Sequence, residues 1–282
     1  MKHILITGAN SYIGSALQKH LQGKPYQVTM LDVRNDDWTN RSFAGIDAVL
    51  HVAAMVHQKE RPDMEEEFFR VNRDLAVRVA RKAKADGVGQ FLFMSSMSVY
   101  GTDTGVITPE TVPQPTTFYG KSKLEAEALL RQEADEGFRV CILRPPMVYG
   151  PGCKGNFQNI IKIVKRLPLF PVLDNTRSMI YIENLCEFLK LCIDQCEEGL
   201  FFPQNREYVQ TAWMARVIAG KLGRRIWFSP LVGRCIYPLI HVVPIFRKAF
   251  GSQFYQGTER HDFCYCIRDN AESVEDSVLT DR

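Results

Sequence analysis

The stretch Lys2-His3-Ile4-Leu5-Ile6-Thr7-Gly8-Ala9-Asn10-Ser11-Tyr12-Ile13-Gly14 joins a short apolar run to a segment with helical spacing. A strand, a glycine turn and a helix in this order let backbone N–H groups approach a pyrophosphate at the helix N-terminus. Gly8 is expected to make the tight turn, and Gly14 to let helix and strand pack closely. Ser11 stands where the middle glycine of such loops is usual, and its hydroxyl is expected to contact phosphate in compensation. For this loop alone, a strand–helix turn without a ligand is an equal alternative.

Asp32 closes the second predicted strand, residues 27–32, at the distance from the glycines that is expected of a ribose-binding acid. Its carboxylate would accept hydrogen bonds from the adenosine ribose diol and repel a 2′-phosphate. This favours NAD over NADP as the cofactor, although Arg34 follows closely and keeps NADP open. A simple turn residue after a strand is the alternative interpretation of Asp32.

Strand and helix patterns alternate along the first half of the chain. Such alternation is typical of βαβ units, so we expect an α/β fold, a Rossmann-type doubly wound parallel sheet with helices on both faces. The expected strands are residues 2–7, 27–32, 48–52, 90–95 and 139–143. The expected helices are residues 12–22, 65–85, 121–136, 156–166, 183–194 and 211–222.

The alternation loosens after Pro145, where prolines cluster. We expect residues 1–150 to form an NAD-binding core and residues 151–268 a smaller substrate lobe with some return to the core. Residues 269–282 are acidic and polar with few apolar anchors, which predicts a disordered tail. Residues 226–250 are strongly apolar but contain three prolines and Arg234. They predict buried loops and short helices, with a membrane-surface role as the alternative.

Bulk composition argues against several classes of protein. A net charge of +3 is too small to indicate a nucleic-acid partner. No segment offers the ~18 uninterrupted apolar residues of a transmembrane helix. The N-terminal apolar run is short and interrupted by Gly8, unlike a secretory signal. The eight cysteines do not show the paired spacings of zinc sites, so we predict no metal and a cytoplasmic protein with reduced thiols.

The chemical signal is Tyr119-Gly120-Lys121-Ser122-Lys123, a Y-x-x-x-K pattern at the start of a predicted helix. Residues four apart share a helix face, so the Lys123 ammonium is expected near the Tyr119 phenol. A free phenol has a pKa of ~10, and a nearby cation lowers it toward the range that suits a proton shuttle. Lys123 could also bind a nicotinamide ribose. The alternative is an exposed Tyr/Lys pair.

Two hydroxyls, Ser95 and Ser96, end the strand upstream. The carboxyl ends of strands are where an open α/β sheet binds its ligand. Ser96 is therefore expected to donate a hydrogen bond to a substrate oxygen beside Tyr119. Its alternative role is that of a strand-end serine capping a turn.

In order and spacing these residues resemble the extended short-chain dehydrogenase/reductase family, in particular its nucleotide-sugar epimerase and dehydratase branch. The resemblance runs from Lys2 to about Leu222. The motifs that carry it are the glycine loop, Asp32, His51-Val52-Ala53-Ala54, Val71-Asn72, Ser95-Ser96-Met97-Ser98-Val99-Tyr100-Gly101, Tyr119 with Lys123, Leu143-Arg144-Pro145, Val148-Tyr149-Gly150-Pro151 and Arg177-Ser178-Met179-Ile180-Tyr181-Ile182.

The resemblance implies roles for the matching positions. Tyr119 would be the acid–base, Lys123 its electrostatic partner and Ser96 the substrate hydrogen bond. Asn156 and Arg177 would hold the substrate diphosphate, because arginine grips phosphate oxygens in a bidentate manner; a surface charge is the alternative for Arg177. Met97 would also contact the substrate, and Pro146 would lie beside the nicotinamide. The implied NAD-binding residues are Gly8, Asn10, Ser11, Tyr12, Ile13, Gly14, Asp32, Ala53, Ala54, Asn72, Tyr119, Lys123 and Pro145.

Three departures from the family pattern matter. Met97 and Ser98 replace the Asp-Glu pair that dehydratases of this branch use, which argues against dehydration. Met147 stands where many members place a substrate-binding asparagine, so the substrate's identity is open. Asp32 and Ala48 are too close for the usual extra strand and helix. The sheet is therefore expected to lose or shorten an edge strand, with Asp37-Trp38 covering the adenine instead.

The resemblance implies an NAD-dependent nucleotide-sugar oxidoreductase, first of all a UDP-hexose 4-epimerase that acts through a transient 4-keto sugar. One alternative is an NAD(P)H-dependent 4-ketoreductase of a deoxysugar nucleotide. Another is a catalytically silent dinucleotide-binding regulator, and a third is a structural partner in polysaccharide assembly that uses residues 226–250. A homodimer is also expected.

Overall fold

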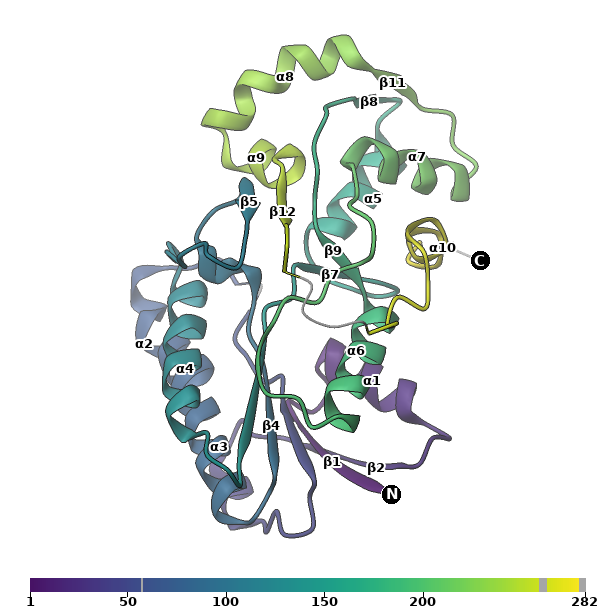
Figure 1. Ribbon diagram of the computed structural model, residues 1–282. Coiled ribbons are helices and arrows are strands. Elements are labelled where there is room, and N and C mark those ends of the chain that lie inside the picture. The colour runs from purple at the N-terminus through teal and green to yellow at the C-terminus, as the bar shows by residue number, and fades with distance from the viewer. Residues whose placement is uncertain (57, 259–262, 279–282) are drawn as a thin grey trace.

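The computed structural model describes residues 1–56, 58–258 and 263–278 and is built on a six-stranded sheet in the order β10-β6-β4-β3-β1-β2 (Figure 1). Neighbouring strands of this sheet run parallel throughout. The strands are β1 (Lys2–Thr7), β2 (Tyr26–Leu31), β3 (Ala48–His51), β4 (Gln90–Met94), β6 (Arg139–Leu143) and β10 (Gly199–Phe201). The doubly wound α/β fold that the sequence predicts is confirmed.

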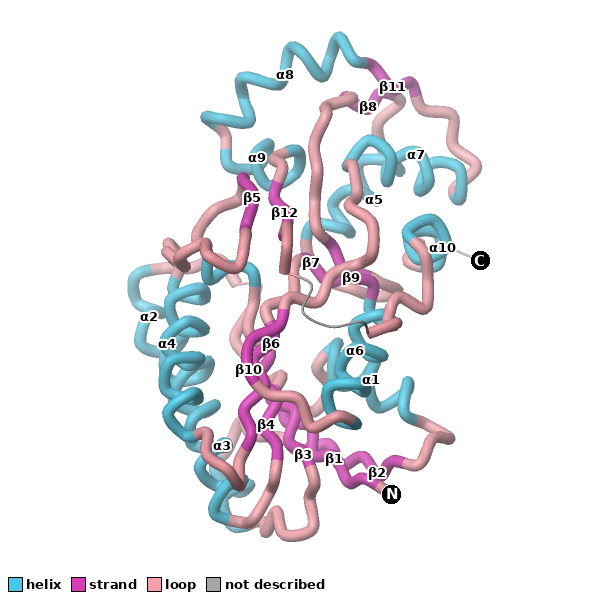
Figure 2. Tube along the Cα trace, viewed as in Figure 1, coloured by secondary structure: helices cyan, strands magenta, loops and turns pink. Residues whose placement is uncertain are grey.

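Helices cover both faces of the sheet (Figure 2). Because side chains alternate along a strand, Ile4 and Ile6 point to one face of β1 and Leu5 to the other. Burial on both faces explains why the strands read as continuous apolar runs. On the Ile4 side lie α1 (Tyr12–Leu21) and α6 (Ile182–Asp194), and on the other side lie α2 (Glu65–Phe69), α3 (Leu75–Ala85) and α4 (Phe118–Glu133).

The helix expected over residues 65–85 is not uniform. A π-helical turn, η3 (Arg70–Asp74), separates α2 from α3, and the short 3₁₀ helix η2 (Pro62–Met64) precedes α2. A π turn inserts an extra residue into the helical repeat and rotates the side chains that it carries. At this position it turns Asn72 inward, where it is fully buried.

The connection between β2 and β3 carries the 3₁₀ helix η1 (Asp36–Asn40), and β2 forms the edge of the sheet, which confirms the expected loss of an edge strand. The expectation that Trp38 covers the adenine is wrong. Trp38 is 2% exposed and packs in the core with Phe43, while the Arg78 guanidinium lies 5.4 Å from its ring centroid. Because no further strand covers β2, the Trp38 side chain shields the apolar core from water at this edge of the sheet.

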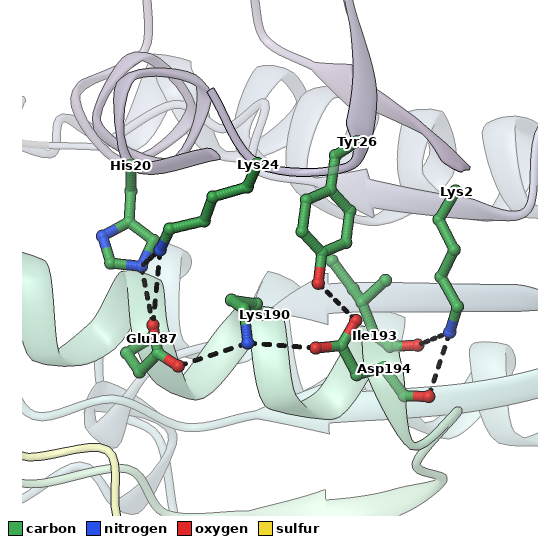
Figure 3. Close-up of polar contacts among 8 residues, drawn as sticks. All are labelled: Lys2, His20, Lys24, Tyr26, Glu187, Lys190, Ile193 and Asp194. Carbon is green, nitrogen blue, oxygen red and sulfur yellow. Dashed lines mark hydrogen bonds and ion pairs between the residues drawn. The ribbon is translucent and has the colours of Figure 1, made fainter. Parts of the chain in front are cut away.

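A hydrogen-bonded seam joins α6 to β1, α1 and β2 (Figure 3). Lys2 Nζ donates to the backbone oxygen of Asp194 at 3.0 Å, and the Tyr26 hydroxyl donates to the Asp194 carboxylate at 2.5 Å. Glu187 lies 2.8 Å from His20 Nε2. The seam holds α6 beside α1. The N-termini of both helices lie at the carboxyl edge of the sheet.

A second lobe stands over the carboxyl edge of the sheet, and β10 and α6 return from it to the core (Figure 1). Three small parallel strand pairs lie outside the main sheet. They are β7 (Met147–Tyr149) with β9 (Met179–Tyr181), β8 (Leu169–Pro171) with β11 (Trp227–Ser229), and β5 (Gly105–Ile107) with β12 (Gln253–Tyr255). The remaining helices are η4 (Met97–Tyr100), α5 (Asn156–Arg166), α7 (Thr211–Lys221), α8 (Pro230–Val242), α9 (Pro244–Phe250) and α10 (Asn270–Asp276).

Residues 226–250 form the strand β11 and two short helices, α8 and α9, so the short helices expected here are present. Gly233 and Ile240 are buried, but Leu231 is 72% and Val242 is 76% exposed. The prediction of a buried segment is therefore wrong for the outer side of α8. Within the described parts of the chain, no helix combines the length and apolarity that crossing a membrane demands.

The C-terminal segment is ordered as far as Val278, which corrects the predicted disorder for residues 269–278; residues 279–282 lie outside those described. Val274 and Ser273 are fully buried. Ser273 Oγ is 2.6 Å from the Tyr149 hydroxyl, and Asn205 donates to Asn270 Oδ1 at 2.8 Å. Side-chain hydrogen bonds anchor α10. Hydrogen bonds of this kind do not produce a periodic apolar pattern in the sequence, so the pattern did not predict this helix.

Candidate active site

A cavity of about 2350 Å³ lies where the carboxyl ends of the sheet strands face the second lobe. An open parallel sheet binds ligands at this edge. Most of the residues that the sequence singles out line it together, although they come from separate parts of the chain. They are Gly8, Asn10, Ser11, Tyr12, Ile13, Asp32, Ala53, Ala54, Ser96, Met97, Tyr119, Lys123, Pro145, Pro146, Asn156 and Arg177.

The glycine turn brings the N-terminus of α1 to the cavity wall. Gly8 has φ of +86°, and a Cβ there would lie 3.0 Å from the Ala53 backbone nitrogen. Ser11 caps α1, its Oγ accepting a hydrogen bond from Gly14 N at 3.1 Å. Gly14 does not line the cavity, because it packs against β1, where a Cβ would approach Ile6 Cγ2 to 3.0 Å. The close turn and the open helix end fit a diphosphate.

Asp32 and Arg34 stand together at the end of β2 in the cavity wall. Arg34 Nε lies 2.9 Å from Asp32 Oδ2, and the Arg34 backbone N–H donates to Asp32 Oδ1 at 2.9 Å. These hydrogen bonds lower the pKa of Asp32 to about 2. Asp32 is therefore an anion at neutral pH, as a hydrogen-bond acceptor for a ribose diol must be, but a guanidinium already partners it.

Asn72 supports the cavity from behind rather than lining it, which corrects its expected place in the cofactor groove. Its Oδ1 accepts from Met55 N at 2.7 Å, and its Nδ2 donates to Ser122 Oγ at 3.1 Å. The π turn η3 points the Asn72 side chain between the loop after β3 and the helix α4. Asn72 thus ties the loop after β3 to α4, the helix that carries Tyr119.

Two caps hold the first turn of α4. Thr117 Oγ1 accepts from Gly120 N at 3.0 Å. The Glu60 carboxylate accepts from Phe118 N at 2.9 Å and from Tyr119 N at 3.0 Å. Glu60 lines the cavity as well, and nothing in the sequence pattern singles it out. Because the Glu60 carboxylate accepts hydrogen bonds from N–H groups at the N-terminus of α4, it fixes the position of the Tyr119 backbone.

Burial dominates the electrostatics of the Tyr119–Lys123 pair. It raises the pKa of Tyr119 to about 12, while a hydrogen bond with the Ser96 side chain acts in the opposite direction. It lowers the pKa of Lys123 to about 7, with Glu127 acting in the opposite direction. Lys123 is 1% exposed, and its Nζ donates to Met94 O at 2.8 Å. Burial therefore shifts the pKa of Tyr119 upward, whereas the sequence predicted that Lys123 would lower it.

The two strand-end serines have different partners. Ser95 Oγ donates to Glu127 Oε1 at 2.5 Å and is buried. Ser96 Oγ accepts from Ser98 N at 3.1 Å and so caps η4, while the residue also lines the cavity. Ser96 thus fills the capping role weighed as its alternative and also lies where a substrate hydrogen bond can be made.

The far end of the cavity is cationic. Arg177 is 9% exposed, and its Nη1 donates to Gly251 O at 2.9 Å. Burial lowers the pKa of Arg177. Lys154 and Lys248 line the same cavity, as does Asp103, whose charge favours the protonated form of Arg177; neither lysine follows from a sequence motif. With Asn156 at the N-terminus of α5, this group suits the negative charges of a diphosphate.

Among the described residues, no three His, Cys, Asp or Glu side chains lie close enough together to hold a metal ion. The eight cysteines are unpaired, and Cys186 and Cys192 are buried within α6 as core residues.

Comparison with known proteins agrees with this arrangement. Residues 4–202 match the sequence profile of the NAD dependent epimerase/dehydratase family. The chain is 32% identical to a UDP-glucose 4-epimerase of Vibrio cholerae over 89% of its length and 83% of that protein. It is 30% identical to a GDP-6-deoxy-D-mannose reductase of Pseudomonas aeruginosa over 55% of each chain. Its fold is similar to that of UDP-glucuronic acid 4-epimerase from Bacillus cereus in complex with NAD, with a TM-score of 0.73, 17% identity and 98% and 97% coverage.

Proposed function

The chain belongs to the NAD dependent epimerase/dehydratase family, and from this premise we propose that it is a UDP-hexose 4-epimerase that acts through a transient 4-keto sugar. One observation carries the proposal. A phenol with a hydroxyl and a lysine beside it, Tyr119 with Ser96 and Lys123, lines the same cavity as the Gly8 turn and the cation Arg177. The cavity therefore offers acid–base groups between a dinucleotide site and a diphosphate site.

The residues present fit NAD, because a Cβ at Gly8 would close the turn and Asp32 supplies a charged acceptor at the end of β2. The Gly8 turn and the N-terminus of α1 would hold its diphosphate, and Asp32 its adenosine ribose. Lys123 would hold the nicotinamide ribose, with Pro145 beside the ring. NAD, when bound, supplies a hydride acceptor and donor for a sugar carbon.

Tyr119 is proposed to remove the proton from the sugar hydroxyl at C4 and to return it after the keto sugar has turned over. Ser96 donates a hydrogen bond to the same sugar oxygen and holds it in place. Because burial raises the pKa of Tyr119 to about 12, proton removal needs a nearby cation to stabilise the phenolate. Lys123 supplies that cation in its charged form, which Glu127 favours. Arg177, Lys154 and Lys248 hold the diphosphate, so the sugar can rotate while its carrier stays bound.

Dehydration is not proposed. Met97 and Ser98 occupy the first two positions of η4, and Met97 is 6% exposed. A thioether and a hydroxyl do not provide the acid and base that eliminating water requires.

The test is incubation of the purified protein with NAD and a panel of UDP-hexoses, followed by proton NMR. Inversion at C4 of one sugar, with no net consumption of NAD, is the expected result. If every sugar in the panel stays unchanged at NAD concentrations that saturate the enzyme, the epimerase proposal fails.

A second candidate is a 4-ketoreductase of a deoxysugar nucleotide. The observation that favours it is Arg34, whose guanidinium partners Asp32 and reduces the repulsion that would exclude a 2′-phosphate. Consumption of added NADH or NADPH by a keto sugar would identify this activity, whereas NAD retained through purification supports the epimerase. A silent regulator is disfavoured because Ser96, Tyr119 and Lys123 are all present at the cavity. A homodimer remains a prediction.

A further inference from the structure

We propose that the outer face of the second lobe, formed by β11 and α8, docks on an anionic lipid bilayer. Figure 1 shows α8 as the outermost element of this lobe, at the end of the molecule opposite the main sheet. The proposal concerns a surface outside the cavity and does not depend on which sugar the cavity accepts.

The first support is the division of α8 into an inner and an outer face. Gly233 packs so tightly that a Cβ would lie 1.9 Å from Val172 O, and Ile240 is 6% exposed in the core. On the opposite side of the helix, two residues along the chain from each of these, Leu231 is 72% exposed and Val242 is 76% exposed. Trp227 on β11 is 75% exposed. Exposed aliphatic side chains on one face of a helix, with an exposed tryptophan next to them, are typical of segments that lie in a membrane interface.

The second support is the charge of this part of the chain. Residues 208–258 contain no aspartate or glutamate, whereas the rest of the sequence mixes both signs. Seven basic residues fall within this stretch: Arg216, Lys221, Arg224, Arg225, Arg234, Arg247 and Lys248. Arg225 and Arg234 are exposed beside Trp227 and Leu231. Lys221 lies 3.7 Å from the Glu275 carboxylate and Lys248 lines the cavity, so the proposal uses Arg216, Arg224, Arg225 and Arg234. Basic side chains close to an apolar patch complement the negative surface of a bilayer rather than a neutral protein partner.

The third support is a shallow pocket of about 550 Å³ at the same surface, lined by Arg216, Arg224, Arg225 and Trp227. The Arg216 guanidinium lies 4.8 Å from the centroid of the Phe228 ring, which holds it in place over an aromatic face. Guanidinium groups bind phosphate oxygens in a bidentate manner. The pocket therefore suits a lipid phosphate, while Trp227 and Leu231 enter the acyl boundary.

The surface is also connected to the cavity. Lys248, on the short helix α9 directly after α8, lines the cavity wall. A docked molecule would therefore hold the diphosphate end of its active site close to the lipid surface.

The test is co-sedimentation of the full chain with vesicles of phosphatidylcholine alone or of phosphatidylcholine and phosphatidylglycerol in equal parts. We expect binding to the anionic vesicles, with little to the neutral ones. Raising the salt from 0.1 M to 1 M shortens the screening length from ~10 Å to ~3 Å and should release most of the protein.

Two double variants separate the charged and the apolar contributions. Arg225→Gln with Arg234→Gln should weaken binding about 25-fold, at about fivefold for each charge near the surface. Leu231→Ser with Val242→Ser should weaken it at least about tenfold. None of these four residues lines the cavity, so turnover of a free nucleotide sugar should be unchanged, which also shows that the variants are folded.

Matched controls come from exposed residues elsewhere. Arg41→Gln, after η1, removes an exposed arginine, and Val112→Ser removes a valine that is 70% exposed. Both should bind vesicles like the parent protein. Equal binding to neutral and anionic vesicles, or equal losses in the controls, would overturn the proposal. So would a dimer in sedimentation equilibrium that Leu231→Ser with Val242→Ser dissociates while vesicle binding is absent, because a second copy would then cover this face.

Discussion

Glu127 and Arg144 form a buried bidentate ion pair, with 2.9 Å from Arg144 Nε to Glu127 Oε1 and 2.6 Å from Arg144 Nη2 to Glu127 Oε2. Glu127 lies one turn after Lys123 on α4, and Arg144 directly follows β6. Ser95 at the end of β4 donates to the same carboxylate. The pair therefore fastens two strand ends to the helix that carries Tyr119, and it sets the distance between Ser96 and the phenol.

Glu127→Ala should lower the free energy of unfolding by about 3–5 kcal/mol, because it leaves the Arg144 guanidinium buried without its carboxylate. Urea unfolding followed by circular dichroism measures the change. The control is Asp63→Ala, which breaks an exposed pair with Arg61 and should cost no more than about 1 kcal/mol. Equal losses in the two variants would show that Glu127 does not stabilise the strand ends.

Tyr119→Phe should reduce turnover by about 10²–10⁴-fold, because it removes the group that accepts and returns the substrate proton. The affinity for NAD should change little, since the Tyr119 backbone N–H is held by the Glu60 carboxylate, independently of the phenol hydroxyl. Steady-state kinetics and isothermal titration with NAD measure the two quantities. Full activity in this variant contradicts the assigned role.

Gly8→Ala and Gly87→Ala test the close approach at the dinucleotide turn. The two glycines have nearly the same φ, +86° and +83°, so both substitutions incur similar backbone strain of about 1–2 kcal/mol. At Gly8 the new Cβ also meets the Ala53 backbone at 3.0 Å, whereas at Gly87 nothing lies within 4 Å. Gly8→Ala should therefore be the less stable variant in urea and should bind NAD more weakly, while Gly87→Ala keeps the parent affinity. A matching NAD affinity in both variants would remove Gly8 from the cofactor site.

Asp32→Ala should raise the dissociation constant for NAD by about tenfold or more, because a hydrogen bond to a charged group contributes about 1.5–3 kcal/mol. The affinity for NADP should fall less, or rise, since Arg34 is freed from its carboxylate partner. Titration calorimetry with both dinucleotides measures the preference. Asp37→Ala, an exposed carboxylate in η1, is the control and should leave both affinities unchanged. An unchanged NAD affinity in Asp32→Ala would assign the ribose to another residue.

His51 should make stability depend on pH. It is fully buried between Phe91 and Phe93, and burial lowers its pKa from 6.5 to about 3. Between these values the unfolded chain binds a proton that the folded protein does not, so the free energy of unfolding falls as pH falls below about 6.5. The expected loss from this group is about 1.6 kcal/mol between pH 6.5 and pH 5.

The comparison that isolates this loss is urea unfolding of the parent protein and of His51→Gln at both pH values. Carboxylates titrate in both proteins. Only the difference between the two proteins in how the free energy of unfolding changes with pH therefore reports on His51. Parallel pH dependence in the two proteins would mean that His51 is protonated in the folded state.

Much of the fold followed from local patterns. Alternating apolar runs and helical spacing placed β1, α1, β2, β3 and β4 within a few residues, because both signals depend on neighbours in the chain. The spacing between Asp32 and Ala48 likewise predicted that the sheet loses or shortens an edge strand, and the structure has β2 at that edge. The helix expected over residues 65–85 hid the π turn that carries Asn72, since a one-residue insertion barely disturbs an apolar period.

By itself, the sequence determined the βαβ order, the glycine turn at Gly8 and the helical pairing of Tyr119 with Lys123, since these depend on residues close together in the chain. Only the tertiary structure decided that Glu127 meets Arg144, that Lys248 reaches the cavity, and that burial raises the pKa of Tyr119. The distances between residues far apart in the chain are set only when the chain folds. The same is true of the exclusion of water from around their side chains.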